Sequence, residues 1–351
     1  FRFAMALNEN RIIKTYSNIE IDLVNDELIR KQTLMLIKDL RPEWREEDIV
    51  FKTFSNGITN RVFQVTHITE PVEHLVFRVF GKNTEKVIDR QLKTICRLEK
   101  VGIAAPLHAK FSNGIVCGYL NGEPLDCKSV REPKIVNKIC ETMAEMHQIP
   151  LTAEEKPFIF DKMGQFLENI PKSLKKDKEN ALYQRYFESN DLKEQYEHLK
   201  QLLTALNQPI VFCHNDLLVN NILYDKNNDK VNFIDYEYAD ANYQLFDIAN
   251  HFCEYAGVDE PDYTLHPSKE EQRAFMKQYL SYFLKRDPLQ EEIEESLSTI
   301  PFFEAASHFF WALWALVQSG NSTIDFDYLK YAVTRHKMFA KVITQCKGVL
   351  G

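Results

Sequence analysis

Hydrophobic and polar positions change their spacing along the chain in a way that separates a β-rich part from a helical part. Helical spacing over the first forty residues stops before Pro42. Short β-rich runs follow, then one helical stretch, then two more apolar runs around the turn Ser112-Asn113-Gly114; these segments cover residues 49–54, 61–66, 75–80, 85–101, 107–111 and 115–120. The pattern predicts a leading helix, three strands, a helix and two strands.

After residue 121 the pattern becomes mainly helical. A stripe at helical spacing predicts a helix packed in a core and consists of Ile135, Ile139, Met143 and Met146. We expect a further helix at 191–206, a strand at 210–213, a hairpin with arms 222–224 and 231–234, and helices from 244 to the end. The expected division is an N-terminal lobe, 1–120, carrying the leading helix, the sheet and the loop between its first two strands, and a helical C-terminal lobe, 121–351.

Composition narrows the class of protein. The 351 residues are 44% hydrophobic and 27% charged, with a formal net charge of -8, so we expect a globular protein with no nucleic-acid partner. Seven cysteines without a C-x-x-C pair indicate free thiols in a reducing compartment. Residues 1–7 are too short for a signal peptide, and a first residue other than Met suggests that the native start lies upstream. The apolar stretch 309–317 is half the length of a membrane span, so we expect a cytoplasmic protein.

The segment 211–224 carries the most informative chemistry. An Asp that precedes an Asn by five positions, in a loop after a hydrophobic strand, is typical of kinases. Here these residues are Asp216 and Asn221, with His214 two positions before Asp216. Asp235 ends the next strand and would be a hard oxygen ligand for a metal ion. Taken singly, Asp and Asn in loops are mostly turn formers and a lone His is usually structural, so only the joint pattern of the four residues indicates a kinase.

The nucleotide side of the expected site has weaker signals. The chain has neither G-x-x-x-x-G-K-[ST] nor G-x-G-x-x-G. The loop between the first two predicted strands could cap phosphates with backbone amides and hydroxyls, although read alone it is an ordinary hairpin turn; it contains Ser55, Asn56, Gly57, Thr59 and Asn60. Arg78, in the third strand, is a half-buried cation that needs an anionic partner such as a phosphate.

Two motifs resemble a known family. His214-Asn215-Asp216 with Asn221 resembles the motif shared by aminoglycoside and choline kinases, and the run 233–254 is similar to the choline/ethanolamine kinase signature almost throughout. Segments 54–61, 255–263, 307–314 and 322–331 look more like ethanolamine kinases. The resemblance covers about residues 40–340. It implies an α+β, two-lobed, protein-kinase-like fold with a small β-rich N-terminal lobe and a larger helical C-terminal lobe.

The resemblance also implies a role for each matching residue. Asp216 would be the catalytic base, Asn221 and Asp235 the Mg²⁺ ligands, and Arg78 the ATP-phosphate contact. The hinge that meets adenine would be Gly118, Tyr119 and Leu120. The amino alcohol would be surrounded by Asp216, Glu254, Trp311, Trp314, Phe326 and Tyr331. Aromatic faces attract a cation and a carboxylate adds Coulombic attraction, which agrees with those roles.

Two points stay open in the sequence. Without the resemblance, Trp311 and Trp314 on an apolar helix would be read as core residues. Where these kinases place an acid facing the cation of the third strand, the chain has Asp89, with Glu85 one turn earlier, so the partner of Arg78 is undecided.

The function expected from the sequence is ethanolamine kinase, with ATP and Mg²⁺ as cofactors, supplying phosphoethanolamine for phospholipid synthesis. Choline kinase is the main alternative. For an aminoglycoside or sugar phosphotransferase, we would expect more hydrogen-bonding carboxylates and fewer aromatic rings at the acceptor site. A non-catalytic binding protein would not need Asp216, Asn221 and Asp235 together. The expected partner is the small amino alcohol, and a homodimer is the assembly considered.

Overall fold

The computed structural model describes residues 13–56, 60–81, 85–174, 177–187, 190–322 and 326–347. The chain divides into two compact units, Phe1–Asn121 and Gly122–Gly351, which are called unit 1 and unit 2 below.

Unit 1 is built on a six-stranded sheet with the strand order β1-β5-β6-β4-β3-β2. The short strand β1 (Lys14–Tyr16) pairs in parallel with β5 (Leu107–Phe111), and the remaining neighbours are antiparallel. Those remaining strands are β2 (Ile49–Asn56), β3 (Asn60–His67), β4 (Glu73–Phe80) and β6 (Gly114–Gly118). Sheet formation follows from the β-rich runs, whose alternate side chains can be buried on one face.

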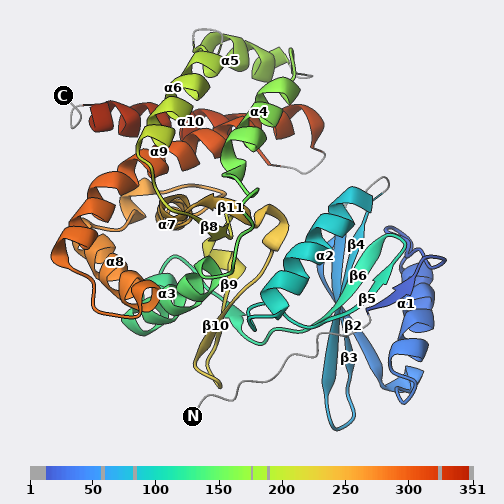
Figure 1. Ribbon diagram of the computed structural model, residues 1–351. Coiled ribbons are helices and arrows are strands. Elements are labelled where there is room, and N and C mark those ends of the chain that lie inside the picture. The colour runs from blue at the N-terminus through green and yellow to red at the C-terminus, as the bar shows by residue number, and fades with distance from the viewer. Residues whose placement is uncertain are drawn as a thin grey trace. The chain divides into compact units, whose positions relative to one another are not determined.

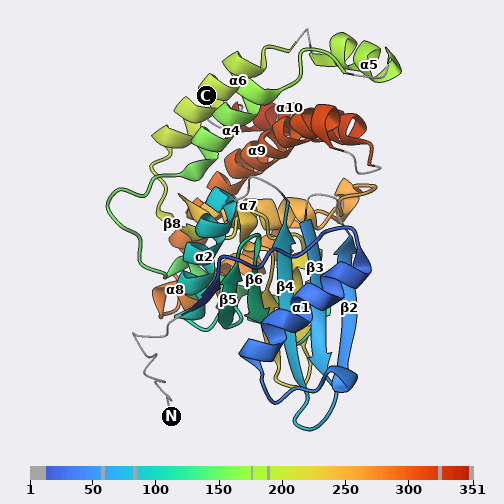
Figure 2. The same ribbon diagram turned by 90° about the vertical axis from the view of Figure 1, so that its right-hand side faces the viewer.

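Two helices cover opposite faces of this sheet, α1 (Asp26–Leu40) and α2 (Glu85–Glu99) (Figures 1 and 2). Helix α1 begins after Asn25, whose side chain accepts hydrogen bonds from two backbone N–H groups of the first turn. Its buried face joins a core that includes Phe63 and Phe77 from the sheet. Because side chains alternate along a strand, Arg78 lies on the other face of the sheet from Phe77.

Unit 2 is mainly helical (Figure 1). Its helices are α3 (Pro133–His147), α4 (Phe158–Asn169), α5 (Asp177–Phe187), α6 (Leu192–Ala205), α7 (Gln244–Glu254), α8 (Lys269–Leu284), α9 (Gln290–Asn321) and α10 (Tyr328–Lys347). Two small sheets position the loops between α6 and α7. One contains β10 (Lys230–Phe233), β9 (Ile222–Asp225) and β7 (Glu123–Pro124), and the other pairs β11 (Asp240–Tyr243) with β8 (Ile210–Cys213).

Helix α9 is the central element of unit 2 and packs against α10, α7, α4 and α8. Among the described residues it is the one helix that is long and apolar enough to cross a membrane, and 83% of its most apolar window is buried inside the protein. The apolar residues of α9 are therefore used to build the core of unit 2.

The structure confirms most predicted elements and adds several. The predicted strands 107–111 and 210–213 match β5 and β8 to the residue, and the predicted helices at 85–101 and 191–206 correspond to α2 and α6. Among the described residues of this segment, 13–40, helical spacing is realised in α1, and β1 precedes it as an edge strand. The strands β1, β7 and β11 and the helices α4 and α5 were not predicted individually.

Candidate active site

The loop after β8 carries Asp216 and has an irregular backbone fixed by its own side chains. Asn215 adopts a left-handed backbone, with φ of 65°, which Asn tolerates better than most residues. Its side-chain amide donates to the carbonyl of Tyr238 at 3.0 Å and accepts from Asn242 Nδ2 at 2.7 Å. His214 Nε2 donates to the carbonyl of Ile234 at 2.9 Å, while its Nδ1 accepts from the backbone N–H of Asp216. The Asp216 side chain is thus held by a loop that is tied to both neighbouring strands.

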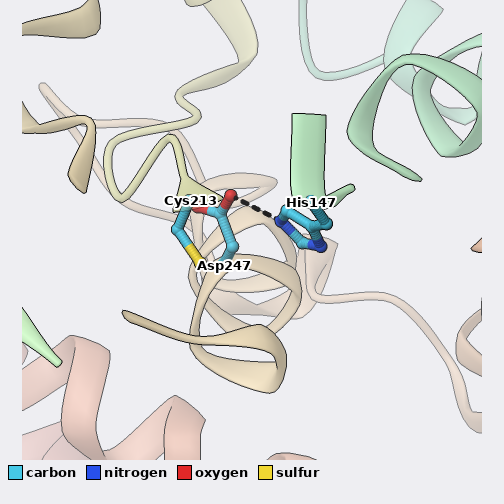
Figure 3. Close-up of side chains that lie close together, drawn as sticks. All are labelled: His147, Cys213 and Asp247. Atoms are coloured by element: carbon cyan, nitrogen blue, oxygen red, sulfur yellow. Dashed lines mark hydrogen bonds and ion pairs between the residues drawn. The ribbon is translucent and has the colours of Figure 1, made fainter. Parts of the chain in front are cut away.

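Asp247, in the first turn of α7, holds the backbone of this loop in place with hydrogen bonds. One carboxylate oxygen accepts from the backbone N–H of His214 at 2.8 Å, and the other accepts from that of Asn215 at 2.7 Å. His147, the last residue of α3, donates from Nε2 to Asp247 at 3.0 Å (Figure 3). Its Nδ1 accepts from the Tyr279 hydroxyl. Burial raises the pKa of Asp247, but the hydrogen bonds from His147 and from the loop N–H groups outweigh it and hold the pKa below its usual value.

Cys213 lies beside His147 and Asp247, so the three side chains have the composition of a metal site (Figure 3). The chemistry of the cluster argues for an anchor instead. Burial raises the pKa of the Cys213 thiol well above its usual value, and its sulfur contacts the carbonyls of Asn242 and Tyr243. A metal ion would need a thiolate and would displace the loop N–H groups from Asp247. The cluster therefore positions the loop that bears Asp216.

Asn221 and Asp235 lie next to the loop that carries Asp216. Asn221 Nδ2 donates to the backbone carbonyl of Asp216 at 2.9 Å, which leaves the amide oxygen as the atom available to a metal ion. The Asn221 carbonyl accepts from the backbone N–H of Ile234, the residue before Asp235. Asp235 follows β10 in a left-handed backbone, with φ of 65°. A carboxylate and an amide oxygen are ligands that Mg²⁺ prefers, so the donor set fits this ion.

Negative charge converges on Asp216, which is buried. Desolvation, followed by repulsion from Asp235, Glu254 and other carboxylates, raises the pKa of Asp216 well above its usual value. Carboxylates that repel one another in a buried place favour a bound cation, which offsets their charge. The arrangement can therefore hold a metal ion, an ammonium group or both.

A chain of aromatic rings runs from the η4 turn (Tyr236–Tyr238) across α9 to the start of α10. Successive ring centroids lie 4.9–5.7 Å apart from Tyr238 through Trp311, Trp314, Tyr328 and Phe326 to Tyr331. We call these six residues the aromatic cluster. The structure thus brings together Trp311, Trp314, Phe326 and Tyr331, all of which were expected at the amino-alcohol site.

Glu254 ends α7 and is fully buried beside Arg335 of α10, whose Nη1 donates to Glu254 Oε1 at 2.8 Å. The same guanidinium lies over the ring of Tyr331, with 5.8 Å from Cζ to the ring centroid. Among the described residues, no hydrogen-bond partner reaches the other carboxylate oxygen, Oε2. A buried carboxylate oxygen without a donor is costly, so Oε2 is a ready acceptor for a ligand.

The residues expected to bind nucleotide all belong to unit 1. Arg78 is half-buried in the centre of the sheet, where it pairs with Val62 and Ile115. Asp89, one of the two acids considered for Arg78, forms an ion pair with Lys110 at 2.6 Å. Gly118 ends β6, with its N–H bound to the Pro106 carbonyl at 2.7 Å. Tyr119 and Leu120 follow it, half-buried, and the Tyr119 ring packs on His74.

Part of the expected phosphate loop lies outside the described residues. This applies to Gly57 and Thr59, and only the strand backbone is described at Ser55, Asn56 and Asn60. The side chain of Glu85 is likewise outside the description.

Sequence reasoning missed Asp247, His147, Arg335 and Tyr238. A signal existed for two of them: Asp247 and Tyr238 lie inside the family-like run 233–254, but neither was given a role. His147 directly follows an apolar helical stripe, where a polar residue is unusual. Arg335 carries no local signal, because its partner Glu254 lies 81 positions away.

Comparisons with known proteins agree on one family. The family model described as "Choline/ethanolamine kinase" matches residues 51–340. Ethanolamine kinase 2 of Rattus norvegicus is 38% identical over 334 residues, which cover 93% of this chain and 84% of that protein.

Solved structures give the same result for the fold. An ethanolamine kinase of Plasmodium vivax has a TM-score of 0.77 and 28% identity, and the match covers 90% of this chain and 89% of that one. A choline kinase of Cryptosporidium parvum has a TM-score of 0.74 at 24% identity, covering 92% and 96%, and shows that the fold is shared.

Proposed function

The chain belongs to the choline/ethanolamine kinase family, and we propose that its preferred substrate is ethanolamine, which it converts to phosphoethanolamine. Members of this family are ATP-dependent phosphotransferases with an alcohol as acceptor. The product would enter phospholipid synthesis.

The observation that carries the choice of substrate is the unpartnered oxygen Oε2 of Glu254. Ethanolamine presents a primary ammonium with three N–H donors, whereas choline presents a methylated cation with none. An ammonium N–H can satisfy Oε2 with a charge-assisted hydrogen bond, and choline would leave the buried oxygen without a donor. The relatives named ethanolamine kinase in rat and Plasmodium vivax support the same choice.

Choline is the second candidate because the aromatic cluster would attract a methylated cation as well. Trp311, Trp314, Phe326 and Tyr331 would serve either amine through their ring faces. The two substrates therefore differ mainly in the hydrogen bond to Glu254.

In the proposed reaction, Asp216 orients the substrate hydroxyl and accepts its proton as the oxygen attacks the γ-phosphorus of ATP. Asn221 and Asp235 would hold Mg²⁺, which neutralises phosphate charge when bound. The anchored loop contributes by keeping Asp216 in one orientation, because transfer without a covalent intermediate depends on positioning and electrostatics.

In unit 1, we propose that Arg78 contacts the nucleotide phosphates and that residues 118–120 contact the adenine. The support is the half-buried position of Arg78 and the main-chain groups that follow β6. We also propose a cytoplasmic location, since the seven cysteines are all free thiols.

The test is an ADP-release assay with ethanolamine, choline and an aminoglycoside. We expect kcat/KM for ethanolamine to exceed that for choline by about tenfold or more, or roughly 1.4 kcal/mol, and the aminoglycoside to be inactive. Glu254→Gln should reduce kcat/KM for ethanolamine more than for choline. Equal or better efficiency with choline would reject the substrate while leaving the kinase chemistry in place.

A further inference from the structure

The ion pair between Glu254 and Arg335 is buried on both sides, and each side chain is 1% exposed. Buried pairs of this kind contribute little net stability, because removing two charges from water costs several kcal/mol. Removing one partner of such a pair nevertheless costs much free energy, because the other charge is left buried and unpaired. Arg335 therefore restricts the position of Glu254 even though the pair adds little to the stability of the fold. A pair with these properties is better explained by what it holds in place.

The guanidinium group of Arg335 is also linked to the aromatic cluster by a chain of hydrogen bonds. Its Nη2 donates to Ser307 Oγ at 2.9 Å, and Ser307 Oγ donates to Asn250 Oδ1 at 2.8 Å. The same Asn250 oxygen accepts from the indole Nε1 of Trp311 at 2.8 Å. One guanidinium therefore connects the buried carboxylate to the orientation of an aromatic ring through two intermediate residues. All five side chains come from α7, α9 and α10.

The pair leaves the two oxygens of Glu254 in different states. Oε1 is bound to Arg335, while Oε2 has no partner among the residues that the structure describes. Arg335 also neutralises the charge of Glu254, so the long-range attraction for a cation is weakened and a short-range acceptor remains. Such a site responds to N–H donors more than to positive charge alone.

We propose that Arg335 is the positioning residue that makes the amine site selective for a primary ammonium. It holds Glu254 with Oε2 free to accept an N–H bond, and it fixes the Trp311 face relative to that oxygen. The inference rests on the proposed ethanolamine kinase activity and adds a residue that makes no contact with the substrate in this scheme.

The planar fork is essential to this role. Arg can bind Glu254 and Ser307 at the same time with two separate nitrogens, whereas the single ammonium of Lys cannot reproduce that geometry. The conservative variant R335K therefore keeps the charge and removes the connection. Ser307→Ala removes only the branch toward Trp311. Arg273→Lys is the matched control, because Arg273 forms an exposed pair with Glu294 far from this network in sequence.

The experiment measures KM and kcat for ethanolamine and choline, KM for ATP, and ethanolamine affinity by calorimetry. For R335K we expect the KM and Kd of ethanolamine to rise about tenfold, the KM of choline to change less than about threefold, and kcat and the KM of ATP to stay within about threefold. Ser307→Ala should weaken both amines equally, by about two- to threefold, and Arg273→Lys should match the wild type. In a Glu254→Gln background, R335K should add less than about a twofold effect, because the two residues act as a unit.

The proposal is overturned if R335K is folded, as shown by its Tm and kcat, and keeps the wild-type KM for ethanolamine. It is also overturned if R335K lowers kcat for both amines with unchanged KM values, since that pattern indicates a general structural defect. Should R335K fail to fold, E254Q/R335Q leaves no unpaired charge and must lose the preference for ethanolamine over choline; a retained preference overturns the proposal. A wild-type enzyme that prefers choline overturns the proposed substrate and this inference together, whereas an unaffected R335K overturns this inference alone.

Discussion

At Asp216 the requirements of catalysis and of folding conflict. A base must be ionised to accept a proton, but burial and the carboxylates of Asp235 and Glu254 raise the pKa of Asp216. A bound cation would resolve the conflict by stabilising the ionised form. Without one, the site stores unfavourable electrostatic energy that the rest of unit 2 must offset.

We therefore predict that Asp216→Asn abolishes turnover but stabilises the ligand-free protein at neutral pH. Because the folded pKa of Asp216 is raised, its contribution to stability is fully present below the unfolded pKa of about 4 and is lost as the pH rises toward the folded pKa. The neutral amide avoids this loss. Unfolding followed at pH 8 should show a gain of about 1–3 kcal/mol, a Tm increase of a few degrees.

The gain should shrink as the pH is lowered toward 5, where more of the wild-type Asp216 is protonated. Asp225→Asn provides the comparison, because hydrogen bonds to the Asn228 side chain and to loop N–H groups lower the pKa of Asp225, so this substitution should destabilise the protein at pH 8. A lower Tm for Asp216→Asn at pH 8, or near-normal turnover, would contradict the assignment.

Single residues differ in how far the sequence reveals them. Asp216, Asn221 and Asp235 could be predicted because all three lie within twenty positions and follow strands with clear apolar runs. Asp247 and Arg335 act through partners 33 and 81 positions away, so only the folded chain shows what they bind. The free oxygen of Glu254 is likewise a property of packing, since it depends on which oxygen Arg335 occupies.

Helix α7 connects the two halves of the proposed chemistry. All its residues are buried, with Asp247 in its first turn under the loop of Asp216 and Glu254 at its last position in the amine network. The N-terminal position of Asp247 also suits a carboxylate, because the helix dipole is positive there. A displacement of α7 would therefore move the base and the amine acceptor together.

For this anchor we predict a graded series of defects in kcat with little change in KM for ethanolamine. Asp247→Asn should lower kcat by about a hundredfold, because the amide presents an N–H group to a backbone N–H and shifts the loop. His147→Ala should cost about tenfold, since Asp247 keeps both loop N–H donors. Tyr279→Phe, which removes only the hydroxyl bound to His147, should stay within about threefold.

Steady-state kinetics at saturating ATP decides the order, with Tyr282→Phe on the same helix as the control for loss of a hydroxyl. Tyr282 donates to Asn137 and has no link to the Asp247 network in the described contacts. An equal kcat for Asp247→Asn and the wild type would mean that the loop is positioned by other contacts.

Helices and strands whose apolar residues recur at a regular spacing could be predicted from the sequence. Elements that form only because they pair with or pack against distant parts of the chain could not. Apart from β1, the strands of unit 1 have clear apolar patterns, as do the helices α3 and α6. The strand β1 is three residues long and exists because it pairs with β5, and β11 exists because it pairs with β8. Helix α9 has apolar residues on all sides and includes Pro301, so its length of 32 residues follows from burial rather than from an amphipathic stripe.

Across the whole molecule the net charge is -8, and part of that charge is concentrated around one buried carboxylate in unit 2. Asp235, Glu254, Glu237 and Asp247 all contribute repulsion at Asp216. Of these, Asp247 is compensated by hydrogen bonds and Glu254 by Arg335. A cation bound beside Asp216 would relieve the repulsion that these carboxylates exert on it.

With carboxylates gathered around Asp216, we expect Mg²⁺ alone, without nucleotide, to stabilise the folded protein. A cation that binds the folded state raises stability by RT ln(1 + [L]/Kd), so millimolar MgCl₂ should raise the Tm of the wild type if the ion binds with a millimolar or lower Kd. Asp235→Asn should remove the increase and Asn221→Ala should reduce it, because each deletes a proposed ligand. Glu292→Gln, at a partly exposed carboxylate paired with Arg286, should leave it unchanged. NaCl at matched ionic strength separates specific binding from screening. The same Tm increase in Asp235→Asn and the wild type would show that the ion binds elsewhere. Loss of both the Tm increase and the kinase activity in Asp235→Asn would assign Mg²⁺ binding and catalysis to one site.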